Sequence, residues 1–305
     1  MAFRFGTPGP DTLTGEASSD VLSGLGGNDR LDAVDGADAV FGGDGSDTLY
    51  GGAGDDLVDG GSGDDVVVGD RSGGGPAPVG AGGSPGRNLL LGGDGNDTIR
   101  GGYGGDTAFG GAGDDNIVGW GFGPPSPSGS LAWAALDDAD ALWGGGGADV
   151  IRGGGGNDRI DGEEGDDTLH GAHGIDTLTG GAGADLFLFG REDLAGLDIA
   201  GGVGEGNRDV VTDFRSGEDV LDVSGYRSSF LPAGTPRMEF LGTDPFVDEL
   251  RPQVRYEVEG GRTIVQIYSP FNAPPPDVPA PPATATVEIE LRGARGISED
   301  DLILG

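Results

Sequence analysis

The chain repeats a nine-residue unit, and this repeat constrains its fold more than any other feature. The full unit reads Gly-Gly-x-Gly-x-Asp-x-U-x, where U is a large apolar residue. Complete units begin at residues 42, 51, 60, 92, 101, 110, 144, 153 and 180. Looser units in the same phase begin at Gly6, Gly15, Gly24, Ala33, Gly83, Ala135, Gly162 and Gly171. A short fixed period is typical of solenoids, whose units bury apolar side chains by stacking on one another.

Position eight of the unit predicts the core. Gly and Pro make up 68 and 19 of the 305 residues, a content that without periodicity would indicate disorder. The apolar residue instead recurs at one place, and in a short strand x-U-x only the middle side chain points inward. The expected core residues are Leu13, Leu22, Leu31, Val40, Leu49, Val58, Val67, Leu90, Ile99, Ala108, Ile117, Leu142, Ile151, Ile160, Leu169, Leu178 and Phe187.

Charge and composition exclude several classes of partner. The formal net charge is -36, which argues against nucleic acid and anionic membranes and favours a polyvalent cation. There is no Cys, so neither a disulfide framework nor a thiolate metal site is expected. No apolar run approaches the roughly 18 residues of a membrane span. The N-terminus lacks the apolar core of a cleaved signal peptide, so we expect none.

The oxygen-rich turns of the unit favour Ca²⁺. Glycine permits a tight turn in which carbonyl groups converge, and the Asp at position six adds a carboxylate. Such a flexible set of oxygen ligands suits Ca²⁺ better than Mg²⁺, so we expect multiple bound calcium ions. The candidate carboxylate ligands are Asp11, Asp29, Asp38, Asp47, Asp56, Asp65, Asp97, Asp106, Asp115, Asp140, Asp149, Asp158, Asp167, Asp176 and Asp185. The candidate turn glycines are Gly42, Gly45, Gly51, Gly54, Gly60, Gly63, Gly92, Gly95, Gly101, Gly104, Gly110, Gly113, Gly144, Gly147, Gly153, Gly156, Gly180 and Gly183.

These repeats resemble those of the RTX, or haemolysin-type, calcium-binding proteins. The resemblance implies an all-β fold, a right-handed parallel β-roll (β-solenoid) with two units per turn and ions between stacked loops. Same-edge aspartates then lie two units apart, as Asp47 and Asp65 do. Asn88 stands where one of these aspartates is expected, which weakens that site although an amide oxygen can still coordinate.

The repeat phase divides the chain into two parts. Residues 1–188 form the predicted roll, with loop insertions at 69–82 and 119–134 that are rich in Gly and Pro. Residues 189–305 form a predicted C-terminal cap, mostly β, that covers the open end of the stack. Within it, residues 253–268 alternate around Gly260-Gly261 as a hairpin, and 284–291 alternate as a further strand.

The C-terminal region suggests the route of export. Residues 212–224 (TDFRSGEDVLDVS) resemble the segment after the repeats of serralysin-type proteases, and EDDLILG resembles a C-terminal signal for type I secretion. The resemblance implies a type I exporter as partner, recognising Asp300, Asp301, Leu302, Ile303 and Leu304. Stacked aspartates repel without calcium, so we expect a disordered metal-free chain that folds after export, as a secreted extracellular protein.

The chain lacks the HExxH motif of zinc proteases. The two histidines, His170 and His173, fall at repeat positions that we expect to be exposed. We therefore expect no catalytic residues and no enzyme activity. Two alternatives stay open: a calcium-dependent structural or adhesive protein that self-associates, and a hydrolase with its site in 189–305.

Overall fold

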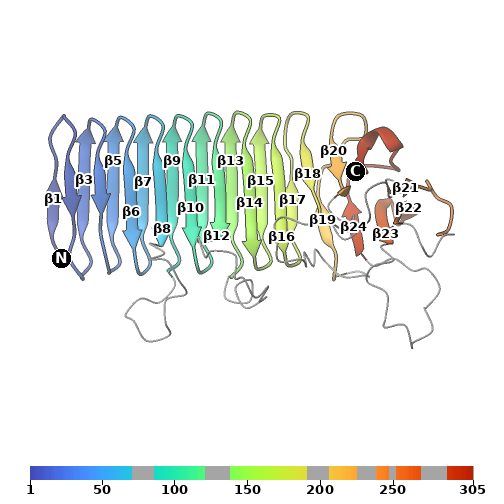
Figure 1. Cartoon of the computed structure of the whole chain (residues 1–305), viewed down its shortest axis with the longest axis horizontal. Helices are drawn as coiled ribbons and strands as arrows, with labels where there is room; N and C mark the ends of the chain where they lie inside the picture. Colours follow the sequence, from blue (N-terminus) through green and yellow to red (C-terminus); the bar gives the residue numbers. More distant parts are fainter. Residues whose placement is uncertain are drawn as a thin grey trace, which may run out of the picture.

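Each nine-residue unit folds into one strand and one turn, and successive strands alternate between two sheets. The computed structural model describes residues 1–70, 86–120, 138–190, 206–224, 238–246, 252–268 and 287–304. The stacked units form a long roll with the N-terminus at one end (Figure 1). Because consecutive strands belong to opposite sheets, each strand pairs with the strand two units away. Val21–Ser23 thus lies beside 39–41, and 39–41 beside 57–59.

The two sheets, here called A and B, have 14 and 11 strands. Sheet A contains, in order, β1 (Phe3–Phe5), β3 (Val21–Gly26), β5 (Ala39–Asp44), β7 (Leu57–Ser62), β9 (Leu89–Asp94), β11 (Thr107–Ala112), β13 (Ala141–Gly146), β15 (Arg159–Glu164), β17 (Thr177–Thr179), β19 (Asp209–Val211), β24 (Val287–Leu291), β23 (Arg262–Tyr268), β22 (Gln253–Glu259) and β21 (Glu239–Phe240). Sheet B contains β2 (Thr12–Thr14), β4 (Arg30–Asp32), β6 (Thr48–Gly52), β8 (Val66–Asp70), β10 (Thr98–Gly102), β12 (Asn116–Trp120), β14 (Val150–Gly155), β16 (Thr168–His173), β18 (Leu186–Leu188), β20 (Val220–Asp222) and β25 (Leu302–Ile303).

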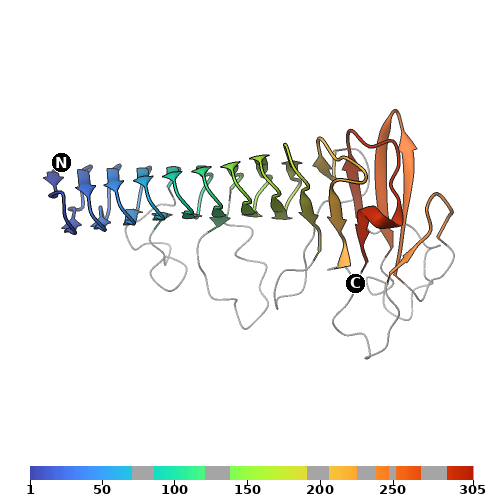
Figure 2. The same ribbon diagram turned by 90° about the horizontal axis from the view of Figure 1, so that it is seen from above.

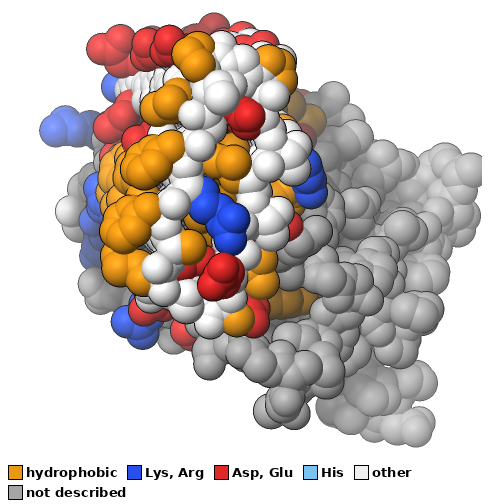
Figure 3. All heavy atoms as spheres, turned by 90° about the vertical axis from the view of Figure 1, so that its left-hand side faces the viewer, with side chains coloured by type: hydrophobic (Ala, Val, Ile, Leu, Met, Phe, Trp, Pro, Cys, Tyr) orange, Lys and Arg blue, Asp and Glu red, His pale blue; other side chains and the backbone are white. Residues whose placement is uncertain are grey.

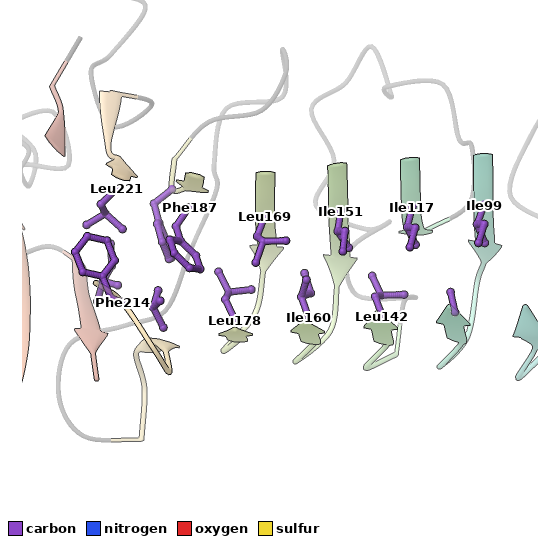
Figure 4. Packing of buried hydrophobic residues seen from close by; sticks show 14 of the residues in the cluster. Ile99, Ile117, Leu142, Ile151, Ile160, Leu169, Leu178, Phe187, Phe214 and Leu221 are labelled. Atoms are coloured by element: carbon purple, nitrogen blue, oxygen red, sulfur yellow. The ribbon is translucent and has the colours of Figure 1, made fainter. Parts of the chain in front are cut away.

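The predicted core is confirmed. Every position-eight side chain from Leu22 to Phe187 is buried between the sheets, where the two rows face each other (Figure 4). Leu13 is only partly buried, because the first turn of the roll has a neighbour on one side alone. A fully buried aliphatic side chain stabilises a fold by roughly 1.5–3 kcal/mol, so this double row supplies the main apolar contribution.

The structure corrects the register at both insertions. Gly69 and Gly119, rather than Gly83 and Ala135, occupy position one of the interrupted units, because each packs against the position-six residue of its own turn, Asn88 or Asp140. The insertions therefore open after position two, at Asp70 and Trp120, where the sheet B strand has ended. The ladder continues across them, since Leu57 pairs with Leu89 and Ala108 with Leu142.

Parallel pairing continues beyond residue 188. Strand β19 pairs with β17 and strand β20 with β18, and β24 and β25 then extend the two sheets. The predicted hairpin is confirmed: β22 and β23 are antiparallel, and Gly260 and Gly261 both have positive φ in the turn. Figure 2 shows this antiparallel part standing at the far end of the roll. The division at residue 188 stays a prediction.

The N-terminal end carries a charged pair. Arg4 lies opposite Leu22 in the sheet, at the position that holds an apolar residue in later strands, and its guanidinium lies 3.2 Å from Glu16. Figure 3 looks onto this end and shows hydrophobic side chains gathered along its left flank. None of the described helical residues forms a segment long and apolar enough to cross a membrane.

Candidate metal centre

The position-six residues form two ladders along opposite edges of the roll. The A–B ladder lies in the turns that lead from sheet A to sheet B. It contains Asp11, Asp29, Asp47, Asp65, Asp97, Asp115, Asp149, Asp167, Asp185 and Asp219. The B–A ladder lies in the turns that lead back. It contains Asp20, Asp38, Asp56, Asn88, Asp106, Asp140, Asp158, Asp176 and Asp209. The structure thus brings every candidate aspartate into a ladder.

One oxygen of each ladder carboxylate is used by the protein. The backbone N–H of each ladder residue donates to Oδ1 of the next, as from Asp47 to Asp65 at 2.7 Å and from Asp38 to Asp56 at 2.9 Å. Since both the donor and the acceptor repeat every two units, the hydrogen bonds fix the orientation of the whole row. The second oxygen, Oδ2, then points in one direction along each edge.

At ten described ladder aspartates, Oδ2 lacks a protein donor. These oxygens are buried and have no hydrogen-bond partner in the described structure at Asp29, Asp38, Asp47, Asp56, Asp65, Asp97, Asp115, Asp149, Asp167 and Asp185. A buried, unsatisfied carboxylate oxygen is costly, because it has lost water without gaining a replacement. A row of such oxygens lacks the partners that would offset the cost of burial, and a bound cation would supply them.

The same burial makes the ladder carboxylates hard to ionise without metal. Burial raises the pKa of Asp56, Asp65 and Asp115 to about 7, and neighbouring aspartates add to the shift. It raises the pKa of Asp47 and Asp149 to about 6. A nearby cation acts in the opposite direction and restores the charged carboxylate.

The glycine at position one is required because the carboxylate passes so close to it. A side chain at Gly51 would place its Cβ 2.5 Å from Asp56 Oδ2, and one at Gly42 would collide with Asp47 Oδ2 and with the carbonyl oxygen of Gly60. Position four needs glycine for its backbone, with φ of 119° at Gly45 and 117° at Gly63. The turns thus place carboxylate and carbonyl oxygens close together.

Backbone oxygens are needed to complete any ion site. Among the described residues, no three His, Asp or Glu side chains lie close enough together to hold a metal by themselves. Carboxylate and carbonyl oxygens together are the donor set that Ca²⁺ prefers, and the buried Oδ2 rows fit that ion. Calcium would supply the positive charge that these oxygens lack.

The ends of the ladders differ from the middle. Asp20 accepts hydrogen bonds from the N–H of Ala2 at 2.5 Å and of Glu16 at 2.6 Å, and from Ser18 Oγ at 3.1 Å. The hydrogen bond from Ala2 is the largest cause of its lowered pKa. Asp20 therefore has protein donors where a mid-ladder residue such as Asp56 has none on Oδ2.

Sequence reasoning missed Asp209 and Asp219, the last residue of each ladder. Asp209 Oδ1 accepts from Asp176 N–H at 2.8 Å, and Asp219 Oδ1 from Asp185 N–H at 3.2 Å. The nine-residue phase is lost after Leu188, but the short pattern Asp-Val-Leu at 219–221 repeats the end of a unit and could have shown the second. The prediction that His170 is exposed is wrong: its side chain is buried beside Arg152 in sheet B.

The family comparison agrees with this geometry. A family model described as RTX calcium-binding nonapeptide repeat (4 copies) matches residues 5–40, 32–67, 82–121, 135–169 and 161–193. Curated proteins gave no significant match.

Two solved structures, both subunits of the Azotobacter vinelandii mannuronan C5-epimerase, are similar to the chain. The solution structure of the AlgE6R3 subunit is 28% identical, with 55% of this chain and 80% of that one covered, at a TM-score of 0.36. That of the AlgE6R2 subunit is 24% identical, with 64% and 90% covered, at 0.35. The family matches span more than half of the chain, whose stacked Gly- and Asp-rich turns carry the buried carboxylates, and the chain belongs to the RTX calcium-binding nonapeptide repeat family.

Proposed function

We propose that this chain is a secreted protein that binds multiple Ca²⁺ ions through its two Asp ladders and folds when it binds them, after export by a type I system. The observation that carries the proposal is the set of ten buried Oδ2 atoms without protein donors along the two described ladders. The ligands are the ladder aspartates and the turn carbonyls that surround them. Calcium supplies charge neutralisation, so that binding energy becomes folding energy.

Export in the unfolded state fits a fold of this kind. Extracellular calcium modules bind at about 10⁻⁴–10⁻³ M, so the chain would stay unfolded in the cytosol and fold outside the cell. The tail residues Asp301, Leu302 and Leu304 are buried in the folded protein. An exporter that recognises them must therefore do so before the chain folds.

A calcium titration followed by far-ultraviolet circular dichroism tests the proposal. We expect a disordered spectrum in chelator and a cooperative rise of β signal at millimolar Ca²⁺, with little response to Mg²⁺. A well-folded β spectrum in excess chelator would count against folding on binding. Small-angle scattering of the same samples gives an independent measure, since the folded roll is far more compact than the unfolded chain.

The outer face of sheet A favours an alternative function in assembly. Phe3, Phe5, Leu89 and Phe109 are exposed there, and Phe109 stacks on Trp143 with ring centroids 4.7 Å apart. Such an apolar face fits a structural or adhesive protein that associates in calcium. Light scattering against Ca²⁺ concentration separates the two functions: a monomer favours the soluble protein, and large particles that Phe109→Asp dissolves favour assembly.

A hydrolase site in 189–305 is the weakest of the three. Several of the described charged side chains there form ion pairs, such as Arg208 with Glu288 at 3.1 Å and Arg262 with Glu290 at 3.1 Å. These pairs lie on the strands β23 and β24 or beside them and support the end of sheet A. Assays with generic ester, peptide and glycoside substrates would test this alternative directly.

A further inference from the structure

The amide of Asn88 has a fixed orientation in the B–A ladder. Its Oδ1 accepts from the N–H of Asp56 at 3.1 Å, and its own backbone N–H donates to Asp106 Oδ1 at 2.8 Å. Asn88 thus takes the place of a ladder aspartate on both sides. Since the oxygen is already bound to Asp56 N–H, the nitrogen Nδ2 must occupy the other position.

In a ladder aspartate such as Asp56, the position that corresponds to Asn88 Nδ2 is filled by the unpartnered oxygen Oδ2. A Cβ built on Gly69 would lie 2.5 Å from Asn88 Nδ2, just as one on Gly51 would lie 2.5 Å from Asp56 Oδ2. An amide NH₂ is only a donor, and its hydrogens repel a cation. At this step the ladder therefore presents hydrogens where its neighbours present oxygen.

Two further residues, Asp70 and Arg87, give this turn a different net charge from that of the preceding turn. Asp70, at position two, accepts from Tyr103 N–H at 3.1 Å and Gly86 N–H at 3.4 Å, and its Oδ1 is buried without a partner. Arg87, at position five, brings a positive charge where the preceding turn of this ladder has Asp55. Asp70 and Arg87 cancel, so the turn is neutral at 69–70 and 86–88, whereas Asp55 and Asp56 give the preceding turn two negative charges.

We infer that the two ladders bind calcium unequally: the A–B ladder takes an unbroken row of ions, whereas the B–A ladder is interrupted at Asn88. At this step the Asn88 amide and the Asp70 carboxylate replace the metal: Nδ2 of Asn88 and Oδ1 of Asp70 are both buried there without a hydrogen-bond partner in the described structure. This inference rests on calcium binding by the ladders.

The neighbouring turn on the opposite edge shows the contrast. There Asp65 N–H donates to Asp97 Oδ1 at 2.7 Å, and Asp97 N–H to Asp115 Oδ1 at 2.7 Å, with Oδ2 buried and unpartnered at all three aspartates. The A–B ladder therefore passes the level of the first insertion without a break. The interruption belongs to one edge alone.

Counting bound ions tests the inference. We would measure Ca²⁺ per chain by equilibrium dialysis with radioactive calcium at saturation, after circular dichroism has shown each variant to be folded. Asn88→Asp restores the missing ligand and should add at least one ion per chain. Asn96→Asp is the matched control, because Asn96 Oδ1 also accepts a backbone N–H, from Asp114 at 3.0 Å, but its side chain is exposed at position five. It should leave the number unchanged.

Two more variants guard against a failure of Asn88→Asp to fold. Asn88→Leu and Asp70→Asn should both bind as many ions as the unmodified protein, since neither residue is a ligand. Loss of an ion in either variant, or an unchanged number in folded Asn88→Asp, would overturn the inference. An unmodified chain that binds no calcium would overturn it together with its premise, and the first titration point shows this before any variant is needed.

Discussion

The backbone N–H of Asp47 donates to Oδ1 of Asp65 at 2.7 Å, while Oδ2 of both residues is buried without a partner. One carboxylate thus does two different things. Its first oxygen joins neighbouring turns in the absence of metal, and its second oxygen demands a positive charge. The ladder is therefore preorganised by the backbone and destabilised by its own unpaired oxygens, and the balance between the two depends on calcium and on pH.

The metal-free chain should be more stable in acid than at neutral pH. The folded-state pKa values of about 7 at Asp65 and Asp115 and about 6 at Asp47 lie above the unfolded value of about 3.9. Stability from a raised pKa is fully present below the unfolded value and is lost as pH rises through the folded one. In chelator, β signal should fall between pH 4 and pH 7.5. A rise over that range would contradict this prediction, and saturating Ca²⁺ at pH 7.5 is the control that restores the signal.

Removing one carboxylate should matter more in the middle of a ladder than at its end. Asp56→Asn keeps the acceptor for Asp38 N–H but removes the unpartnered Oδ2, so it should raise the Ca²⁺ midpoint of folding several-fold. Asp20→Asn should change it little, because Asp20 is already hydrogen-bonded by Ala2, Glu16 and Ser18. Titrations followed by circular dichroism give both midpoints. Equal shifts in the two variants would show that the ladder does not bind calcium as proposed.

Replacing Val34 by glycine should stabilise the folded protein. Its φ is 84°, at position two of a unit where most turns have Gly, and a left-handed conformation costs an L-residue roughly 1–2 kcal/mol. Since glycine loses more backbone entropy on folding, by about 0.5–1 kcal/mol, the net gain of Val34→Gly should be up to about 1 kcal/mol. Urea unfolding in saturating Ca²⁺ measures it. Val34→Ala is the control, since it removes the branched side chain but keeps the strained backbone, and a similar gain there would assign the effect to side-chain size.

Sequence periodicity predicted the core and the ladders because one residue type at one position has one physical environment. Leu49 and Ile99 fall at position eight and are buried, and Asp47 and Asp97 fall at position six and face the turn. Counting from the sequence could do this because the strands pair with a fixed offset of two units. The core residues can therefore be predicted from the repeat alone.

Counting nine-residue units gave the wrong register at the insertions, where paired strands are no longer separated by a fixed number of residues. At the first insertion the phase resumes at Gly83 in the sequence, but Gly69 fills position one in space, since the strand β8 ends only at Asp70. The side at which Asn88 presents its nitrogen depends on the N–H of Asp56, a residue 32 positions away. Long-range register and hydrogen-bond direction are properties of the folded stack, and a local pattern does not contain them.

The C-terminal tail closes the roll through Asp301. Burial alone would raise the pKa of this carboxylate, but hydrogen bonds from Ser298, Ser216 and Gly217 outweigh it, and the pKa is lowered. Asp301→Ala leaves these donors unsatisfied and should destabilise the folded protein by about 2–4 kcal/mol, without changing the number of bound ions. Urea unfolding in Ca²⁺ measures the loss. Because a lowered pKa adds stability that is lost as pH falls through the folded-state pKa, the difference from the unmodified protein should shrink in acid.

If the tail also carries the export signal, its sequence and its docking should be separable. Leu302 pairs with Leu221 in sheet B, so a charge on either side prevents docking. The double variant Leu302→Asp and Leu304→Asp changes the tail itself, whereas Leu221→Asp disturbs the same contact and leaves the tail intact. In a host with a reconstituted type I exporter, the tail variant should stay inside the cell and Leu221→Asp should appear outside. Secretion of both would place the signal elsewhere, and retention of both would mean that export depends on folding rather than on the tail sequence.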